Sequence, residues 1–402
     1  MRSDFARFAT ANAITQLGTQ VTLIALPLAA VLTLGADPFE LGLLTAAETA
    51  AFLLVGLPAG VWVDRLRRRP VLIWADVVRG LALLTVPVAA WYGVLSLWQL
   101  YAVALVIGFG TVFFDIAHMS FLPAVVGRDR LEGGNSVLEV TGRTATLAGP
   151  GIGGALVQWL TAPVALFLDA VSYLLSGLLL SRVRAEESPA EGGRGHLRRE
   201  IAEGIAYVRR EPVLRTVAVL GALVQLGNGM WAVGAPLFLV GELELGAGAY
   251  GLMLSISALG GLAGAALAPR AVARYGTGRT MAASAGATCV LYPPIALTGG
   301  DWRLGLFPVF LTAVALSSVV FGITQLSYRQ RTTPEHLLGR VNASMRFLMW
   351  SALPLGGLAG GALGEWAGAQ AVFVAATLVC GLAYLPAAWS RAVRKLDPAT
   401  DR

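Results

Sequence analysis

The sequence predicts an all-α membrane protein with twelve transmembrane helices in two six-helix bundles. The chain has 402 residues, of which 56% are hydrophobic and 13% are charged, about half the charged fraction of a typical soluble protein. Apolar runs of about 20 residues, the length that crosses a bilayer, recur along the whole chain. Arginine-rich loops separate many of these runs, as in multi-pass membrane proteins.

The apolar runs predict spans at 10–32, 41–63, 71–91, 97–119, 137–159, 163–181, 214–238, 248–268, 280–298, 304–326, 343–364 and 370–389. The one long polar connection has an amphipathic helical pattern over 197–210, which fits a helix on the membrane surface or a solvated linker helix equally well. We therefore expect an N-terminal bundle over 1–182, a cytoplasmic linker over 183–213 and a C-terminal bundle over 214–402.

The loop charges predict the orientation. Arginines follow the even-numbered spans, whereas the opposite loops carry acids such as Asp37, Glu40 and Glu242. The positive-inside rule then places both termini in the cytoplasm. We expect the protein in the inner or plasma membrane of the cell. Because the net charge of +6 is spread over these loops, we do not expect a nucleic-acid partner. The two cysteines lie far apart in apolar runs, so neither a disulfide framework nor a metal site is expected.

The two halves contain a weak internal repeat. The segment "GGALVQW" at 153–159 matches "GGALGEW" at 360–366, with an offset of 207 residues. At the same offset Leu131 meets Leu338 and Asn135 meets Asn342. Several matches in one register favour duplication of a six-span unit, and paired six-span halves with a site between them are typical of transporters.

Two motifs resemble those of the major facilitator superfamily. "GVWVDRLRRRP" at 60–70 resembles its loop signature G-x-x-x-D-R-x-G-R-R, with Arg67 in place of the usual second glycine. "AGPGIGG" at 148–154 resembles its antiporter motif in the fifth span. Together with "FLDAVSYLLS" and "TTPEHLLGRVNAS", they are similar to the twelve-span branch of drug and siderophore exporters that includes enterobactin-exporter-like and macrolide-efflux-like proteins. The matching residues are Gly60, Asp64, Arg65, Arg68, Arg69, Gly149, Pro150, Gly153 and Gly154.

The resemblance implies a conformational gate at the first motif. Asp64 would face the start of the eleventh span, near 341–344, where a carboxylate meets the positive end of a helix dipole. Arg68 would pair with Asp115. The alternative is that the arginines only anchor the topology. The second motif would let the fifth span approach a neighbour closely and would limit leak. It also has the spacing of a dinucleotide fingerprint, but no strand precedes it.

Ionisable residues inside predicted spans are candidates for proton coupling, because charge is costly in a bilayer. They all lie in the first half: Glu48, Asp76, Arg79, Asp115, Glu139, Arg143 and Asp169. Asp76 with Arg79, and Glu139 with Arg143, are spaced to share a helix face and could neutralise one another. Glu48 and Asp169 have no local partner in the sequence, so Glu48 is the first candidate for a proton site and Asp169 the second. The alternatives are a hydrogen bond to another span or exposure to a water-filled vestibule.

Uncharged polar and aromatic residues in the spans are candidates for a substrate cavity: Gln16, Gln20, Gln225, Asn228, Trp231 and Gln325. An aromatic residue in such a helix can instead pack or face lipid.

These patterns predict a monomeric secondary transporter that exports a small amphiphilic molecule, such as a drug, siderophore or metabolite, in exchange for protons, by rocker-switch alternating access. We expect no cofactor, no metal and no enzymatic activity. Proton-coupled uptake is an alternative, as is a membrane-embedded enzyme or a non-transporting sensor. An enzyme should carry a catalytic cluster at one membrane face and a sensor an added soluble domain, and neither is visible in the sequence.

Overall fold

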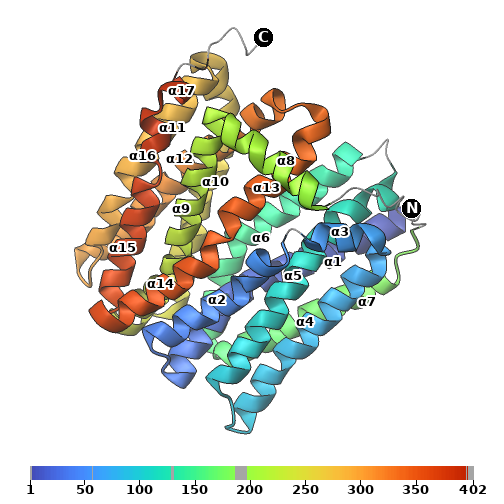
Figure 1. Ribbon diagram of the computed structural model, residues 1–402. Helices are drawn as coiled ribbons and strands as arrows, with labels where there is room; N and C mark the ends of the chain where they lie inside the picture. The colour runs from blue at the N-terminus through green and yellow to red at the C-terminus, as the bar shows by residue number, and fades with distance from the viewer. Residues whose placement is uncertain (1, 57, 128–130, 186–196, 395, 397–402) are drawn as a thin grey trace. The chain divides into compact units, whose positions relative to one another are not determined.

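The computed structural model describes the chain except for residues 1, 57, 128–130, 186–196, 395 and 397–402 (Figure 1). The described residues form helices and connecting turns, and no strand occurs among them. Contacts along the chain define two compact units. Unit 1 comprises residues 1–194 and 244–255, and unit 2 comprises 195–243 and 256–402.

Unit 1 contains the first seven α-helices and the start of α10. Their bounds are α1 Arg2–Leu28, continued by the π-helical segment η1 Ala29–Thr33, α2 Pro38–Leu54, α3 Pro58–Arg65, α4 Arg68–Trp91, α5 Leu97–Val126, α6 Leu131–Trp159 and α7 Ala162–Ser181.

Unit 2 contains the remaining helices. They are α8 Leu197–Arg210, α9 Pro212–Ala235, η3 Pro236–Glu242, the part of α10 Ala247–Tyr275 that follows Ser255, α11 Thr277–Leu291, η4 Pro293–Leu297, η5 Trp302–Gly305, α12 Leu306–Thr332, α13 Glu335–Trp350, α14 Ala352–Ala367, α15 Ala369–Leu382, α16 Leu385–Trp389 and α17 Arg391–Arg394.

Ten helical segments of the described chain are long and apolar enough to cross a membrane. They coincide with ten of the predicted spans. The expected span 41–63 is instead divided into α2 and α3. Pro58 begins α3, and proline can neither donate a backbone hydrogen bond nor continue the preceding turn. The expected span 137–159 lies within the continuous helix α6, whose first half is rich in polar side chains.

Local sequence signals explain several helix ends. At the start of α2, the Asp37 side chain accepts a hydrogen bond from the Glu40 N–H, and the Glu40 carboxylate accepts one from the Asp37 N–H. With Pro38 in the first turn, this is a capping box. Gly93, after α4, and Gly368, between α14 and α15, have positive φ angles of 69° and 83°, which glycine adopts without strain.

The sequence repeat corresponds to the same glycine packing in each unit. In unit 1, a Cβ atom added at Gly149 would lie 2.2 Å from the Cβ atom of Gln20, so α6 lies close against α1. In unit 2, a Cβ atom added at Gly356 would lie 2.0 Å from the Leu226 carbonyl oxygen, so α14 lies close against α9. These two glycines are 207 residues apart, which is the offset of the repeat.

The linker helix α8 forms over the expected residues, but its apolar face is buried against protein. Val208 is part of the core of unit 2, together with Val341 and Met345 of α13. Arg340 donates a hydrogen bond to the Glu203 carboxylate, and a Cβ atom added at Gly204 would lie 2.6 Å from the Arg340 carbonyl oxygen. The helix is therefore an integral element of unit 2. Its apolar face contacts protein, whereas the sequence led us to expect a helix on the membrane surface or in solvent.

Candidate functional site in unit 1

A buried ion pair lies at the centre of unit 1. The Arg79 guanidinium donates a hydrogen bond to the Asp76 carboxylate one helical turn earlier on α4. The two side chains are 1% and 0% exposed. Removing two charges from solvent is costly unless each is compensated, so the spacing of three residues that brings them together is essential here. The pair expected from the sequence is present.

Neighbouring helices complete the environment of Arg79. Its Nη1 donates to Thr111 Oγ1 of α5 at 3.3 Å. Its guanidinium carbon lies 4.6 Å from the ring centre of Phe114 and 4.4 Å from that of Tyr173, both within the range of cation–π attraction. A Cβ atom added at Gly110 would lie 2.6 Å from Arg79 Cγ, so glycine there leaves space for the arginine stem.

Asp169 of α7 is a second buried acid, with 1% exposure. It accepts hydrogen bonds from the hydroxyl groups of Thr22 on α1 and Ser172 on α7, the latter at 2.7 Å. The expectation that Asp169 has no local partner was therefore wrong, and the alternative of a hydrogen bond to another span describes it. A Cβ atom added at Gly18 would lie 1.9 Å from Asp169 Oδ1, so this glycine allows α1 to reach the carboxylate.

Tyr173 contacts both the ion pair and α1, the helix whose Thr22 bonds Asp169. Its hydroxyl group shares a hydrogen bond of 3.0 Å with Thr19 on α1, while its ring lies against Arg79. The polar network thus extends over α1, α4, α5 and α7. Among the described residues, the only fully buried charged side chains are Asp76, Arg79 and Asp169, and all three belong to this network.

Glu48 lies outside the network, on α2. Its side chain is half-buried, and within the described part of the chain its carboxylate makes no hydrogen bond or ion pair. The backbone around it is tightly packed, since a Cβ atom added at Gly108 of α5 would lie 2.1 Å from the Glu48 carbonyl oxygen. The close packing of α2 on α5 therefore fixes the backbone that carries the Glu48 carboxyl group.

The other predicted acids are in more open surroundings. Glu139 and Arg143 form the expected ion pair on α6 at 2.8 Å, but their side chains are 68% and 56% exposed within the protein. Asp115 is half-buried on α5, where its charge acts on Arg79. Asp115 therefore belongs to the electrostatic surroundings of the buried pair.

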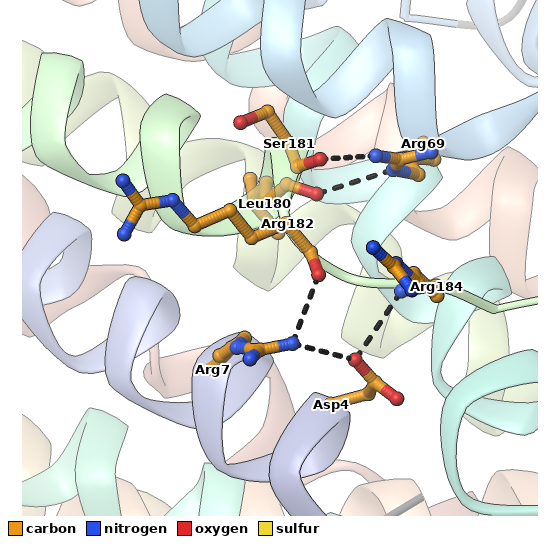
Figure 2. Close-up of polar contacts among 7 residues, drawn as sticks. All are labelled: Asp4, Arg7, Arg69, Leu180, Ser181, Arg182 and Arg184. Carbon is orange, nitrogen blue, oxygen red and sulfur yellow. Dashed lines mark hydrogen bonds and ion pairs between the residues drawn. The ribbon is translucent and has the colours of Figure 1, made fainter.

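The loop motif spans α3 and the start of α4. Gly60, Asp64 and Arg65 lie in α3, and their side chains are outside the part that the structure describes. Arg68 is half-buried at the start of α4. Arg69 donates to the carbonyl oxygens of Leu180, at 3.2 Å, and Ser181, at the end of α7 (Figure 2). These carbonyls are left without helical partners where a helix ends, so Arg69 acts as a side-chain cap.

A second arginine caps the same helix end. Arg7 of α1 donates to the Arg182 carbonyl oxygen at 3.0 Å and to Asp4 at 3.1 Å (Figure 2). Asp4 also accepts from the Arg184 N–H at 3.3 Å. The end of α7 is thus fixed to both α1 and the loop motif within unit 1.

The second motif brings three helices of unit 1 together. Gly149 and Gly153 of α6 face α1, where Cβ atoms added to them would lie 2.2 Å from Gln20 Cβ and 3.1 Å from Val21 Cα. On another face, a Cβ atom added at Gly154 would lie 2.4 Å from the Ala247 carbonyl oxygen at the start of α10, and one added at Gly251 would lie 2.2 Å from the Pro150 carbonyl oxygen. The Gly151 N–H donates to Ser255 Oγ at 2.8 Å. The close approach expected for this segment is therefore present.

Comparison with known proteins decides the family. The family model described as "Major Facilitator Superfamily" matches residues 8–354. The chain belongs to the major facilitator superfamily. It is accordingly a membrane-embedded, multi-pass transporter of small molecules and not an enzyme.

Several relatives of this superfamily member are exporters by name. It is 30% identical over 401 residues to the multidrug efflux pump Tap of Mycolicibacterium fortuitum, covering 95% of this chain and 94% of that protein. It is 27% identical over 343 residues to the enterobactin exporter EntS of Escherichia coli O1:K1 / APEC, covering 84% and 79%. The crystal structure of the nucleoside transporter NupG shares the fold, with a TM-score of 0.78, 13% identity and coverage of 97% and 100%.

The predicted cavity residues of this superfamily member have mixed surroundings. Asn228 donates to Gln225 Oε1 at 2.8 Å, one turn apart on α9. The Trp231 ring packs 5.0 Å from Phe373 and 5.9 Å from Phe307, as in the packing alternative. Gln325 Oε1 is buried and finds no partner among the described residues. Gln16 and Gln20 are half-buried on α1. A role of these residues in substrate binding stays a prediction.

Sequence reasoning missed several of the uncharged residues of the network. Thr22 and Gly18 on α1, and Ser172 and Tyr173 on α7, were not selected. Asp169, Ser172 and Tyr173 have the spacing of one helix face, so part of this signal is visible in the sequence. The partner residues on α1 lie 147 to 154 positions away and can be found only from packing.

Proposed function

We propose that this chain exports a small amphiphilic molecule in exchange for protons. The observation that carries the proposal is the set of acids in unit 1: Glu48, with no partner among the described residues, and Asp169, held by two hydroxyl groups. Ionisable residues in a membrane protein commonly mark proton or ion pathways. The export direction is supported by relatives that are named as a multidrug efflux pump and an enterobactin exporter.

We assign the proton-carrying role first to Glu48 and second to Asp169. Glu48 has no cation or hydroxyl group, among the described residues, to stabilise one protonation state, so its proton can exchange as its surroundings change. Asp169 is fixed by Thr22 and Ser172, and its exchange would require these hydrogen bonds to rearrange. The Asp76–Arg79 pair is self-compensated and instead holds α4 and its neighbours in place.

The proposed transport cycle is a rocker switch of two six-span bundles with both termini in the cytoplasm. In this cycle Asp64, Arg65 and Arg68 form part of a gate that breaks once per cycle. The contact of Arg69 with the end of α7 supports a more local role for that arginine, since it joins the loop motif to a helix of its own unit.

Proton release from liposomes tests the proposal. Purified protein is reconstituted with a pH-sensitive dye, and a panel of fluorescent amphiphilic compounds, ethidium among them, is applied. An antiporter moves protons opposite to the compound, whereas a symporter moves both in the same direction. Movement in the same direction would replace export by proton-coupled uptake. The wild type should move protons when the compound is applied. If Glu48→Gln shows no such compound-dependent proton movement, the result supports the assignment of Glu48.

The gate is tested separately with Asp64→Asn. We expect this variant to insert and purify normally while its transport rate falls at least tenfold, because the gate loses one charge. Arg210→Gln, a change at an exposed arginine of α8, is the matched control and should transport normally. Normal transport by Asp64→Asn would remove the gate from the mechanism without affecting the assignment of Glu48.

A further inference from the structure

A groove opens on unit 1 between α4 and α5. Its volume is about 840 Å³, and its walls include Pro70, Trp74 and Val78 on α4 and Leu105 and Phe109 on α5. Gly110 lies in its lining, next to the stem of Arg79. Trp74 is 66% exposed and Val78 is 44% exposed, so the groove faces the surroundings of the protein rather than its core.

The length of the groove matches one leaflet of a bilayer. The wall from Arg68, where α4 begins, to Val78 extends over eleven residues, or about 15 Å at the rise of an α-helix. The hydrocarbon core of a bilayer is about 30 Å thick. An exposed apolar groove in a membrane-embedded helix pair is in contact with acyl chains, and its depth gives one chain more contact than a flat helix surface would.

Among the described residues that line the groove, Arg67 is the one charged side chain, and it lies at one end. This arginine is exposed, and within the described part of the chain it makes no hydrogen bond or ion pair. Arg69, two residues later, is occupied by the end of α7. Arg67 also occupies the position at which the loop signature usually has glycine. Its guanidinium is therefore available to a ligand in the groove, and guanidinium binds phosphate through paired hydrogen bonds.

We propose that the α4–α5 groove binds one anionic phospholipid of the surrounding bilayer, with an acyl chain along Trp74 and Phe109 and its phosphate group on Arg67. A basic residue near an anionic membrane surface favours such a lipid about five-fold. A second groove on unit 1, of about 710 Å³, is lined by residues such as Pro87, Trp91 and Phe167, and none of the described residues in its lining is charged. It is an internal reference, because lipid held there should show no preference for headgroup charge.

The test is native mass spectrometry of the full chain in detergent with equal amounts of phosphatidylglycerol and phosphatidylcholine. We expect the wild type to retain one phosphatidylglycerol with a preference of about five-fold over phosphatidylcholine. Arg67→Gln should lose this preference, Arg67→Lys should keep most of it, and Arg210→Gln should keep all of it. Val78→Trp, which fills the groove, should reduce retention of that lipid regardless of headgroup.

Four outcomes would overturn the proposal. Equal retention of both lipids by the wild type would show that Arg67 selects no headgroup. An equal loss in Arg67→Gln and Arg210→Gln would indicate a diffuse charge effect. Displacement of the lipid by millimolar inorganic phosphate, or unchanged retention in Val78→Trp, would show that the acyl chain does not occupy the groove.

Discussion

Unit 1 and unit 2 bury polar groups of different kinds. Unit 1 encloses the ion pair Asp76–Arg79, with Tyr173 packed against Arg79, and a second acid, Asp169. Unit 2 buries hydroxyl groups instead, such as those of Thr288 and Ser317, which share a hydrogen bond of 2.8 Å. Its core otherwise consists mainly of aliphatic side chains, together with aromatic rings and closely packed glycines. Both units nevertheless use glycines at corresponding positions to pack one helix pair, α6 on α1 and α14 on α9.

The two units therefore share a mode of helix packing but differ in their buried charges. The shared glycine contacts, of Gly149 with Gln20 and of Gly356 with Leu226, involve no charged side chain. The charges of unit 1 cost free energy to bury and need compensation from several helices. Among the described residues, fully buried charged side chains occur in unit 1 alone, which fits the proposed proton coupling through that unit.

The largest effect should come from breaking the buried pair. Arg79→Leu leaves the Asp76 carboxylate buried without its cation, which we expect to destabilise the protein by about 3–5 kcal/mol. Unfolding in mixed detergent micelles measures the change. The double variant Asp76→Asn with Arg79→Leu should recover a large part of the loss, because no charge is then left unpaired. A small effect of Arg79→Leu alone would mean that the pair is compensated by solvent.

A matched pair of glycine substitutions sharpens the comparison. Gly18→Ala places a Cβ atom near the Asp169 carboxylate, and Gly356→Ala places one near the Leu226 carbonyl oxygen. Each should destabilise the protein by about 1–3 kcal/mol through overpacking. Only Gly18→Ala should also alter the pH dependence of transport, measured in liposomes. If both variants changed the pH profile, the pH dependence of transport would not distinguish unit 1 from unit 2.

Two hydroxyl groups allow a smaller comparison. Thr22→Val removes a hydrogen bond to the carboxylate of Asp169, and Thr288→Val removes one to the hydroxyl of Ser317. Hydrogen bonds to charged groups contribute about 1.5–3 kcal/mol, and those between neutral groups about 1 kcal/mol. The free energy of unfolding should therefore fall more in Thr22→Val. Equal losses would indicate that Asp169 is uncharged in the resting protein.

The smallest effect is expected at the exposed pair on α6. Arg143→Gln breaks its contact with Glu139, but exposed ion pairs at this spacing contribute only about 0.3–0.5 kcal/mol. Its unfolding curve should nearly overlay that of the wild type. A loss of more than about 1 kcal/mol would show that the pair has a structural role beyond a surface contact.

Much of the helix framework could be predicted from the sequence. Hydropathy located ten spans, and the amphipathic pattern located α8. The break at Pro58 was visible in the sequence, yet the apolar residues on both sides favoured one continuous span. Hydropathy sums over a window and does not register a single missing backbone donor.

The candidate site was predictable only where its contacts are local. The spacing of Asp76 and Arg79 on one helix indicated their pairing, and the structure has it. The hydroxyl of Thr22 on Asp169, and Arg69 on the end of α7, join residues more than a hundred positions apart. Such contacts depend on which helices pack together, so no spacing rule along one helix could find them.

The central claim is that the acids of unit 1 couple transport to protons. Its most direct test is the pH profile of compound transport in liposomes for Glu48→Gln, Asp169→Asn and Thr288→Val, the last as the control from unit 2. We predict that Glu48→Gln abolishes the pH dependence, that Asp169→Asn weakens it and that Thr288→Val leaves it unchanged. A wild-type profile in both acid variants would contradict the claim.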